Sequence, residues 1–300
     1  MKNSYKLFRL SMRHNSSIKK YIGIAVLLEI LSVFMLYLLN STYGVLYQGI
    51  KDMDSVVIWQ SIGTFAGIAM VLVVVNGYLG YFLSRLAFEL RTGLTNFALE
   101  TKFAYPPSQY AQRVQEDFKY YGELAVEFWA AILKACLKIP VFVGVIVTLT
   151  QWWVGASIIG AVVIGTIATR ILGRPLVQLQ AQQETNEAEF RSNLRANEEV
   201  GTGFFNQVYY NIIMRQFRTI NHATKRLNFL QSGLGQAFTL LPFILLMPLY
   251  LAKSLPMGEF FQSVRALGTI IDSLTILIDN RQLIVHFESV LTRLEWVNER

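Results

Sequence analysis

Long apolar stretches separated by polar connections are the main pattern of this 300-residue sequence. Each stretch reaches the roughly 18 apolar residues that mark a membrane-spanning helix. A bilayer offers no water to backbone amides, so segments of this kind span it as helices. The pattern predicts six spans, at about 21–47, 56–84, 125–150, 154–172, 232–252 and 262–280.

The polar connections between the predicted spans differ strongly in charge. Of the 27 Lys and Arg, 22 lie in the N-terminal segment, in the connections after spans two and four, and at the C-terminal end, which all fall on one face. The opposite face carries Lys51, Lys253 and Arg265, and Lys134 and Lys138 lie inside span three. The positive-inside rule therefore predicts that both termini are cytoplasmic. The net charge of +7 then reflects topology, and we expect no nucleic-acid partner.

Composition agrees with a multi-pass membrane protein. Hydrophobic residues make up 53% of the chain and charged residues 16%, and the mean hydropathy is +0.38. A soluble domain carries about 25% charged residues. The first apolar run is too long for a cleavable signal peptide, so it is interpreted as a first span, with the basic residues before it as anchors. The lone Cys136 excludes an internal disulfide.

The sequence contains no catalytic or metal-binding pattern. No G-x-x-x-x-G-K-[ST] phosphate-binding loop occurs, so we expect no ATP hydrolysis by these residues and no nucleotide-binding domain within them. His14, His222 and His286 are far apart, and none has metal-ligand spacing to another His or Cys. We expect a protein that is not an enzyme and that holds no metal or cofactor.

The connections are very unequal in length. The outer ones are short, at about 48–55, 151–153 and 253–261, whereas the inner ones have about 40 and 60 residues. The inner segments favour helix, because 85–124 has one strong breaker at Pro106-Pro107 and 176–231 has no proline. Glycine occurs in the latter only at positions 201 and 203, which suggests a turn there.

This arrangement predicts an all-α polytopic membrane protein with long cytoplasmic helical extensions, as in the membrane half of an ABC exporter. In that architecture the span pairs 2–3 and 4–5 project into the cytoplasm. Six spans are too few to enclose a large path, so we expect a domain-swapped homodimer of twelve spans.

Acidic residues are the remaining chemical signal. Glu116, Glu123 and Glu127 are separated by seven and eleven residues, which places them within about 20° of one helix direction. Glu187 and Glu198 are also eleven apart, in the continuation of span four. Two such stripes suggest a ladder of protonatable sites, because carboxylates near one another or partly buried exchange protons near neutral pH.

A plainer interpretation of these stripes stays open. Arg191 and Arg195 lie three or four residues from Glu187 and Glu198, and Lys119 neighbours the first stripe, so the carboxylates can be ordinary salt-bridged pairs on solvated helix faces. Two further acids, Glu29 in span one and Asp272 in span six, stand inside apolar segments. Such groups are functional hypotheses by default, although hydrogen bonding to a neighbouring helix explains them equally well.

Several segments resemble the bacterial SbmA/BacA peptide transporters. Residues 111–117 (AQRVQED) resemble that family's A-Q-R-V-Q-E-D segment, and 187–191 (EAEFR), with an acidic pair eleven residues on, resemble its E-A-x-[FY]-R segment. Residues 43–52 are similar to its Y-x-x-x-Y segment. The chain departs from that family in being shorter, in lacking an additional N-terminal span, and in having almost no outer insertion between spans three and four.

The resemblance implies a homodimeric importer in the bacterial inner membrane that takes up peptides, including antimicrobial peptides, with a proton gradient and without an ATPase. It also implies that glutamates line the cavity, with Glu116, Glu187 and Glu198 at matching positions and Glu123 and Glu127 near another. The leading hypothesis is therefore proton-coupled uptake of peptides or similar bulky solutes. One alternative is the membrane subunit of an ABC transporter whose ATPase is a separate chain. A non-transporting membrane protein is a third class.

Overall fold

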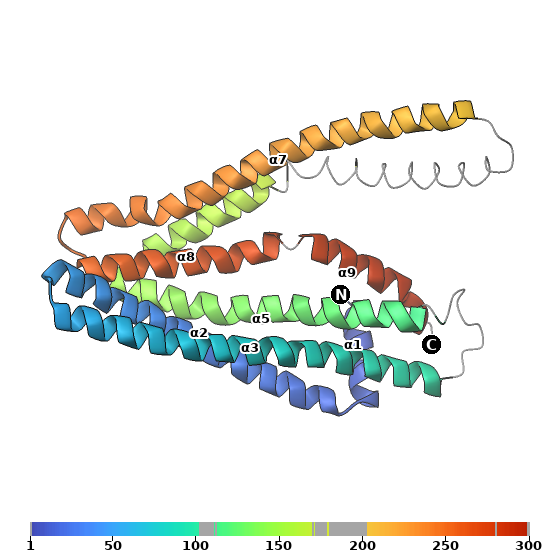
Figure 1. Ribbon diagram of the computed structural model, residues 1–300, viewed down its shortest axis with the longest axis horizontal. Coiled ribbons are helices and arrows are strands. Elements are labelled where there is room, and N and C mark those ends of the chain that lie inside the picture. Colours follow the sequence, from blue (N-terminus) through green and yellow to red (C-terminus); the bar gives the residue numbers. More distant parts are fainter. Residues whose placement is uncertain are drawn as a thin grey trace. The chain divides into compact units, whose positions relative to one another are not determined.

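The computed structural model describes residues 2–101, 113–169, 203–279 and 281–298, with the single positions 111, 171 and 179, and every regular element in these ranges is helical. The elements are α1 (Lys2–His14), α2 (Ser17–Asp52), α3 (Ser55–Glu100), η1 (Arg113–Asp117), α5 (Phe118–Leu149), a helix at Trp152–Thr169, α7 (Gly203–Leu251), α8 (Met257–Asp279), α9 (Arg281–Arg293) and η2 (Glu295–Asn298). The all-α prediction is confirmed (Figure 1).

Five helices of the described part are long and apolar enough to cross a membrane: Ser17–Asp52, Ser55–Glu100, Val114–Leu149, Trp152–Thr169 and Met214–Leu251. They coincide with the first five predicted spans. The sixth, 262–280, coincides with α8, whose 23 residues reach about 35 Å at about 1.5 Å per residue. That α8 crosses the membrane as a sixth span stays a prediction.

Two helices are much longer than a bilayer requires. α3 has 46 residues and α7 has 49. At about 1.5 Å per residue each exceeds ~65 Å, against a hydrocarbon core of about 30 Å. Both therefore continue far beyond their spans, as the helix-compatible connections predict. α7 begins at Gly203, the last residue of the expected turn, while Pro106-Pro107 lies outside the described residues.

The connection between α2 and α3 is shorter than the predicted 48–55. α2 continues to Asp52, and Met53 ends it with a left-handed backbone (φ 55°). The carboxylate of Asp54 then accepts hydrogen bonds from the amides of Val56 and Val57, which caps α3. The two spans therefore form a tight helical hairpin.

The chain divides into two compact units, one of residues 1–156 with 242–300 and the other of residues 157–241. The second contains most of the helix Trp152–Thr169 and most of α7. Within it, a Cβ added at Gly165 would lie 2.8 Å from the Phe238 ring, so the glycine allows these helices to pack closely. Most of span four and the first half of span five thus belong to one unit.

The first unit has a buried core where α1, α3, α5, α9 and η2 meet. Its members are Leu7, Leu94, Phe97, Ala98, Phe118, Tyr121, Ala125, Phe287, Val290, Leu291, Leu294 and Val297. From the sequence, residues 2–14 were interpreted only as basic anchors before the first span. In the structure they form a helix that lies across α3, as Figure 1 shows, and contributes the fully buried Leu7.

At the other end of this unit, α2 and α8 approach closely. A Cβ added at Gly258 would collide with the carbonyl oxygen of Gly44. The Tyr47 ring stacks on Phe261 with centroids 4.0 Å apart, and the hydroxyl groups of Tyr43 and Tyr47 lie 3.3 Å apart. The Y-x-x-x-Y segment therefore packs α2 against α8.

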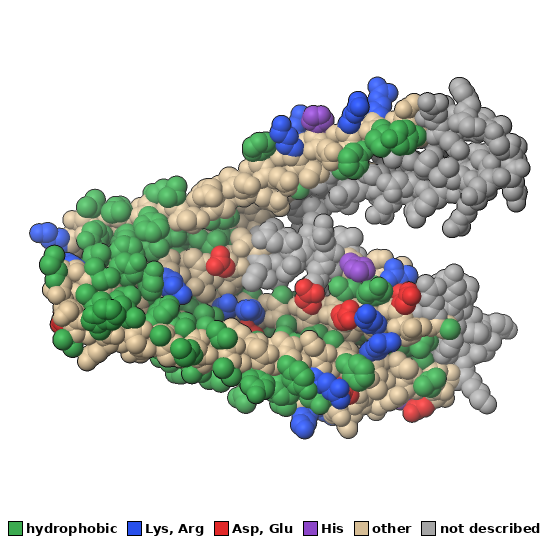
Figure 2. All heavy atoms as spheres, in the orientation of Figure 1, with side chains coloured by type: hydrophobic (Ala, Val, Ile, Leu, Met, Phe, Trp, Pro, Cys, Tyr) green, Lys and Arg blue, Asp and Glu red, His purple; other side chains and the backbone are tan. Residues whose placement is uncertain are grey.

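Side-chain types on the first unit are segregated. In Figure 2 hydrophobic side chains gather over the half of α2 and α3 next to their connecting turn, whereas most acidic and basic side chains lie toward the opposite ends of these helices. Exposed apolar residues on α3 include Trp59, Met70, Val73 and Tyr78. A wide exposed apolar surface of this kind is what a helix facing lipid presents.

Candidate functional site: a charged groove and an intramembrane charge cluster

A groove of about 620 Å³ opens between α3 and α5 in the first unit. Its charged lining comes from Arg91 of α3 and from Lys119, Glu123 and Glu127 of α5. The α5 residues follow at intervals of four, so one face of the helix presents all three in a row. The other lining residues are mostly apolar: Gly80, Leu83, Ser84, Ala87, Phe88, Val126 and Ala130.

A close contact between backbones lies beside this groove. A Cβ added at Gly122 would be 2.5 Å from the carbonyl oxygen of Ala87, so α3 and α5 meet here only because residue 122 has no side chain. Nη2 of Arg91 donates to the carbonyl oxygen of Gln115 at 3.3 Å, which ties this guanidinium to the segment before α5. The walls of the groove are therefore held by backbone packing.

The two glutamates of the groove are exposed. Within the described ranges, neither Glu123 nor Glu127 forms an ion pair shorter than 4 Å, so the salt bridge from Lys119 to Glu123 that the spacing allowed is not seen there. The groove brings two cations and two carboxylates together above an apolar floor. Chemically it suits a ligand that carries both signs of charge.

The other members of the predicted stripes lie elsewhere. Glu116 belongs to the π-helical turn η1, where hydrogen bonds run to the fifth residue and the 100° step of an α-helix does not apply. It is exposed and is not among the residues that line the groove. Its neighbour Asp117 is buried and accepts a hydrogen bond from Nε of Arg293 at 2.9 Å, which ties η1 to α9. Glu187 and Glu198 lie outside the described residues.

A second group of charges lies on α2, α5 and α8 of the same unit. Glu29 of α2 is 3% exposed, and its Oε1 has no hydrogen-bond partner among the described residues. Lys134 and Lys138, one turn apart on α5, interact electrostatically with it. Asp272 of α8 interacts in turn with Lys138. We call these four residues the intramembrane charge cluster.

This cluster joins Glu29 and Asp272, which the sequence singles out separately. Glu29 and Asp272 were each expected to be functional or bonded to a neighbouring helix, and the structure connects them through α5, which contacts both α2 and α8. The four charges sum to zero, as expected for groups whose isolated transfer into a bilayer is costly. The sequence showed Lys134 and Lys138 inside span three. What it did not reveal is that this pair, one helical turn apart, lies near Glu29 and Asp272.

Asp272 differs from Glu29 in being exposed on the surface of the described chain. A carboxylate inside a span that faced hydrocarbon would be strongly unfavourable, and such groups face a helix bundle or a water-filled cavity.

Buried polar atoms continue along α2 and α8. Asn40 is fully buried, and neither its Oδ1 nor its Nδ2 has a partner among the described residues; the same holds for Oγ of the fully buried Ser263. A buried polar group left unpaired costs about 1–3 kcal/mol. Buried polar groups are nearly always hydrogen-bonded in folded proteins, which sets these two positions apart. The described residues contain no group of three or more His, Cys, Asp or Glu placed to hold a metal ion.

Comparison with known proteins assigns these helices to a family. Residues 7–250 match the family model described as ABC transporter transmembrane region 2. An uncharacterized ABC transporter ATP-binding protein of Synechocystis sp. is 23% identical over 303 residues, which cover 92% of this chain and 45% of that protein. ABC transporter D family member 2, chloroplastic, of Arabidopsis thaliana is 25% identical over 195 residues, which cover 61% of this chain and 27% of that protein.

The chain thus spans less than half the length of these relatives. The matched region includes α2, α3 and α5 and all but the last residue of α7, and with them the groove and part of the charge cluster. The chain belongs to the ABC transporter transmembrane region 2 family.

Proposed function

We propose that this chain is the membrane-spanning part of an ABC-type transporter, and that ATP hydrolysis on a nucleotide-binding domain outside these 300 residues drives it. The intramembrane charge cluster carries the proposal of transport, because charges inside apolar spans are costly and are kept where solutes or ions pass. The relative named as an ATP-binding protein matches 92% of this chain with only 45% of its own length, which supports a nucleotide-binding domain elsewhere. In this proposal the 300 residues themselves catalyse no reaction.

The long helices support the same proposal. α3 and α7 each continue tens of ångströms beyond a bilayer, which gives them the reach to contact a domain in the cytoplasm. The 22 basic residues assigned to one face support a cytoplasmic location of these extensions. A helix that runs unbroken from the membrane into the cytoplasm is a suitable element for transmitting nucleotide-driven motion to a solute path.

Purification in mild detergent from native membranes tests the ATP-driven proposal. We expect the full chain to purify with a nucleotide-binding protein or domain, and the complex to hydrolyse ATP in a vanadate-sensitive manner. The matched control is the same preparation carrying a mutation in the phosphate-binding lysine of that nucleotide-binding partner. A preparation that transports solute but hydrolyses no ATP would contradict the proposal.

A homodimer in a bacterial inner membrane, with both termini cytoplasmic, is part of the proposal. The exposed Asp272 supports it, because a second copy and the aqueous path between copies would shield this carboxylate from lipid. The separate unit of residues 157–241 is also the unit that a domain-swapped dimer would exchange. Mass measurement in mild detergent is expected to give two chains per particle, and a particle of about 34 kDa of protein would contradict the dimer.

Proton-driven uptake of peptides or similar bulky solutes is the second candidate. One observation favours it: Glu123 and Glu127 lie exposed, one turn apart, in a groove with an apolar floor. Two adjacent carboxylates of this kind are suited to binding a proton together with a cationic solute. In proteoliposomes with a pH gradient and no ATP, this candidate predicts uptake that Glu123→Gln/Glu127→Gln abolishes and that Glu100→Gln, a control outside the groove, retains.

A further inference from the structure

The N-terminal helix α1 carries a one-sided cluster of positive charge. Lys6, Arg9 and Arg13 lie within about 60° of one another around the helix, by the 100° step per residue. All three are exposed, as are Lys19 and Lys20 in the first turn of α2. No acidic residue precedes Glu29 in the sequence, and within the described ranges none of these five cations forms an ion pair shorter than 4 Å. We call these five residues the basic face.

The protein itself covers the opposite side of α1. Ser4, Leu7 and Ser11 are buried against α3 and α5. The Ser11 hydroxyl donates to the carbonyl oxygen of Leu90 at 2.8 Å, and the Tyr121 hydroxyl donates to the carbonyl oxygen of Ser4 at 2.9 Å. The helix is thus held along its length on one side, and its basic face points away from the bundle.

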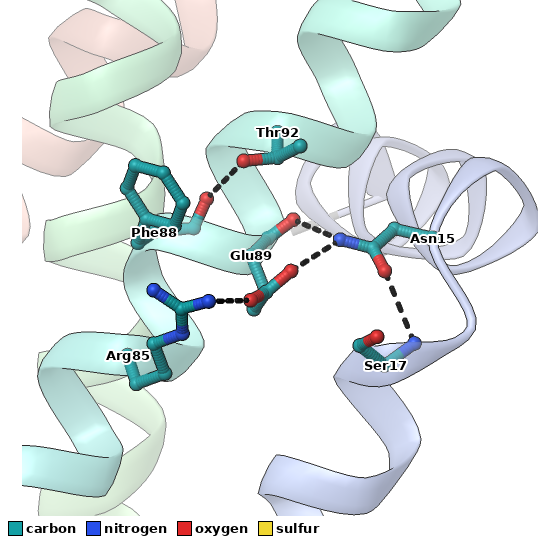
Figure 3. A network of polar contacts seen from close by, with 6 residues as sticks. All are labelled: Asn15, Ser17, Arg85, Phe88, Glu89 and Thr92. Carbon is teal, nitrogen blue, oxygen red and sulfur yellow. Dashed lines mark hydrogen bonds and ion pairs between the residues drawn. The ribbon is translucent and has the colours of Figure 1, made fainter.

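A polar network fixes the joint between α1 and α2 (Figure 3). Nδ2 of Asn15 donates to Oε2 of Glu89 at 2.7 Å and to the Glu89 carbonyl oxygen at 3.2 Å, while Oδ1 of Asn15 accepts from the Ser17 amide at 3.0 Å. The charge of the nearly buried Glu89 is balanced by Arg85, whose Nη2 lies 3.0 Å from Oε1. This joint sets the angle at which α1 leaves the first span, and with it the orientation of the basic face.

The predicted span limits put the joint at the membrane boundary. Lys19 and Lys20 directly precede the first predicted span, and Glu89 lies only five residues, about 8 Å at 1.5 Å per residue, after the end of the second. A helix that crosses the bundle at this level runs along the headgroup region, where basic residues meet the negative surface of the inner leaflet.

We propose that the basic face is a docking surface for anionic lipid headgroups. These lipids belong to the leaflet that contains the inner ends of spans one and two. Charge complementarity selects this occupant, because five exposed cations, none of them in an ion pair shorter than 4 Å within the described ranges, match a surface rich in phosphate groups. Tyr5, which is 64% exposed and lies beside the basic face, adds an amphipathic ring of the kind found at membrane interfaces. Bound lipid holds α1 in place and, through the Asn15–Glu89 contacts, braces the inner end of α3.

The test uses the full chain in mild detergent, titrated with short-chain phosphatidylglycerol or with phosphatidylcholine of the same chain length, and bound lipids are counted by native mass spectrometry. We expect a clear preference for phosphatidylglycerol, weakened by salt. Lys6→Gln/Arg9→Gln/Arg13→Gln is expected to lower the affinity for phosphatidylglycerol at least tenfold, since each basic residue near an anionic surface contributes about a factor of five. Phosphatidylcholine binding should not change.

The matched control keeps the charge. Lys6→Arg/Arg9→Lys/Arg13→Lys is expected to bind phosphatidylglycerol as the native chain does, and both variants should retain the native elution volume. Full phosphatidylglycerol affinity in the glutamine variant would overturn the proposal and point to an acidic protein as the partner of this face. An equal loss for both lipids, or a loss in the charge-keeping variant, would also overturn it, because the effect would then lie in packing and not in charge.

Discussion

The contact between α3 and α5 can be tested with one methyl group. Gly122→Ala would place a Cβ 2.5 Å from the Ala87 carbonyl oxygen, 3.4 Å from the Ala87 carbonyl carbon and 3.6 Å from the Arg91 amide nitrogen. All three atoms belong to helix backbone, so no side chain can rotate away. The helices would have to separate by nearly 1 Å, which widens the groove beside Glu123.

The expected cost is the difference between two terms. Overpacking of a well-packed contact costs about 1–3 kcal/mol. Alanine in place of glycine in a helix regains about 1 kcal/mol. We therefore expect Gly122→Ala to lower the free energy of unfolding by about 1 kcal/mol, and by up to about 2 kcal/mol if the helices cannot relax.

Gly144→Ala is the matched control in the same helix. No atom lies within 4 Å of the Cβ position at Gly144, so this variant should gain helix propensity without a clash. Thermal unfolding of both variants in one detergent, followed by tryptophan fluorescence, should give a lower midpoint for Gly122→Ala and an unchanged or higher midpoint for Gly144→Ala. Equal midpoints would refute the close contact of α3 with α5.

Two further predictions concern the charge cluster and the topology. Glu29→Gln and Lys138→Met are each expected to lower the unfolding midpoint, and the double variant by less than their sum, because removing either charge leaves the other without its attractive neighbour. Additive effects would show that the two residues do not interact. In a Cys136→Ser background, a cysteine at Met53 should react with a membrane-impermeant thiol reagent from outside, and one at Arg9 only after permeabilisation. The reverse labelling pattern would overturn the orientation.

The helices were predictable because a bilayer leaves few choices. In a bilayer, an apolar run of 18 or more residues can pair its backbone hydrogen-bonding groups only by forming a helix. The helices α2, α3 and α7 therefore followed from hydropathy alone. Their ends were less predictable. α2 continues to Asp52 because no helix breaker precedes Met53, and its end depends on a left-handed residue that no periodicity signals.

The candidate sites were only partly predictable, because they depend on contacts between helices. Spacing placed Glu123 and Glu127 on one face of α5, and the structure shows them lining one groove. The same spacing argument does not extend to Glu116, since the π-helical turn before α5 changes the angle per residue. Lys138 and Glu29 were each visible in the sequence, but their proximity arises from the packing of α2 on α5.

The packing of helix α1 on α3 was also not predictable from the sequence. Its basic residues were read from the sequence as anchors, which its exposed charges support. Its docking on α3 required Ser11 to fit against Gly93, where an added Cβ would lie 2.5 Å from the Ser11 carbonyl oxygen. Such small-residue contacts between distant segments leave no periodic trace in a single sequence.

Solute uptake into membrane vesicles tests the central claim most directly. Everted vesicles with and without the protein would be incubated with a mixture of peptides and amphipathic solutes, and retained solutes identified by mass spectrometry, either with ATP and an uncoupler or with a pH gradient and no ATP. The ATP-driven account predicts retention that requires ATP, that vanadate abolishes, and that collapse of the proton gradient leaves unchanged. Retention driven by the pH gradient alone would contradict that account and favour proton-coupled transport.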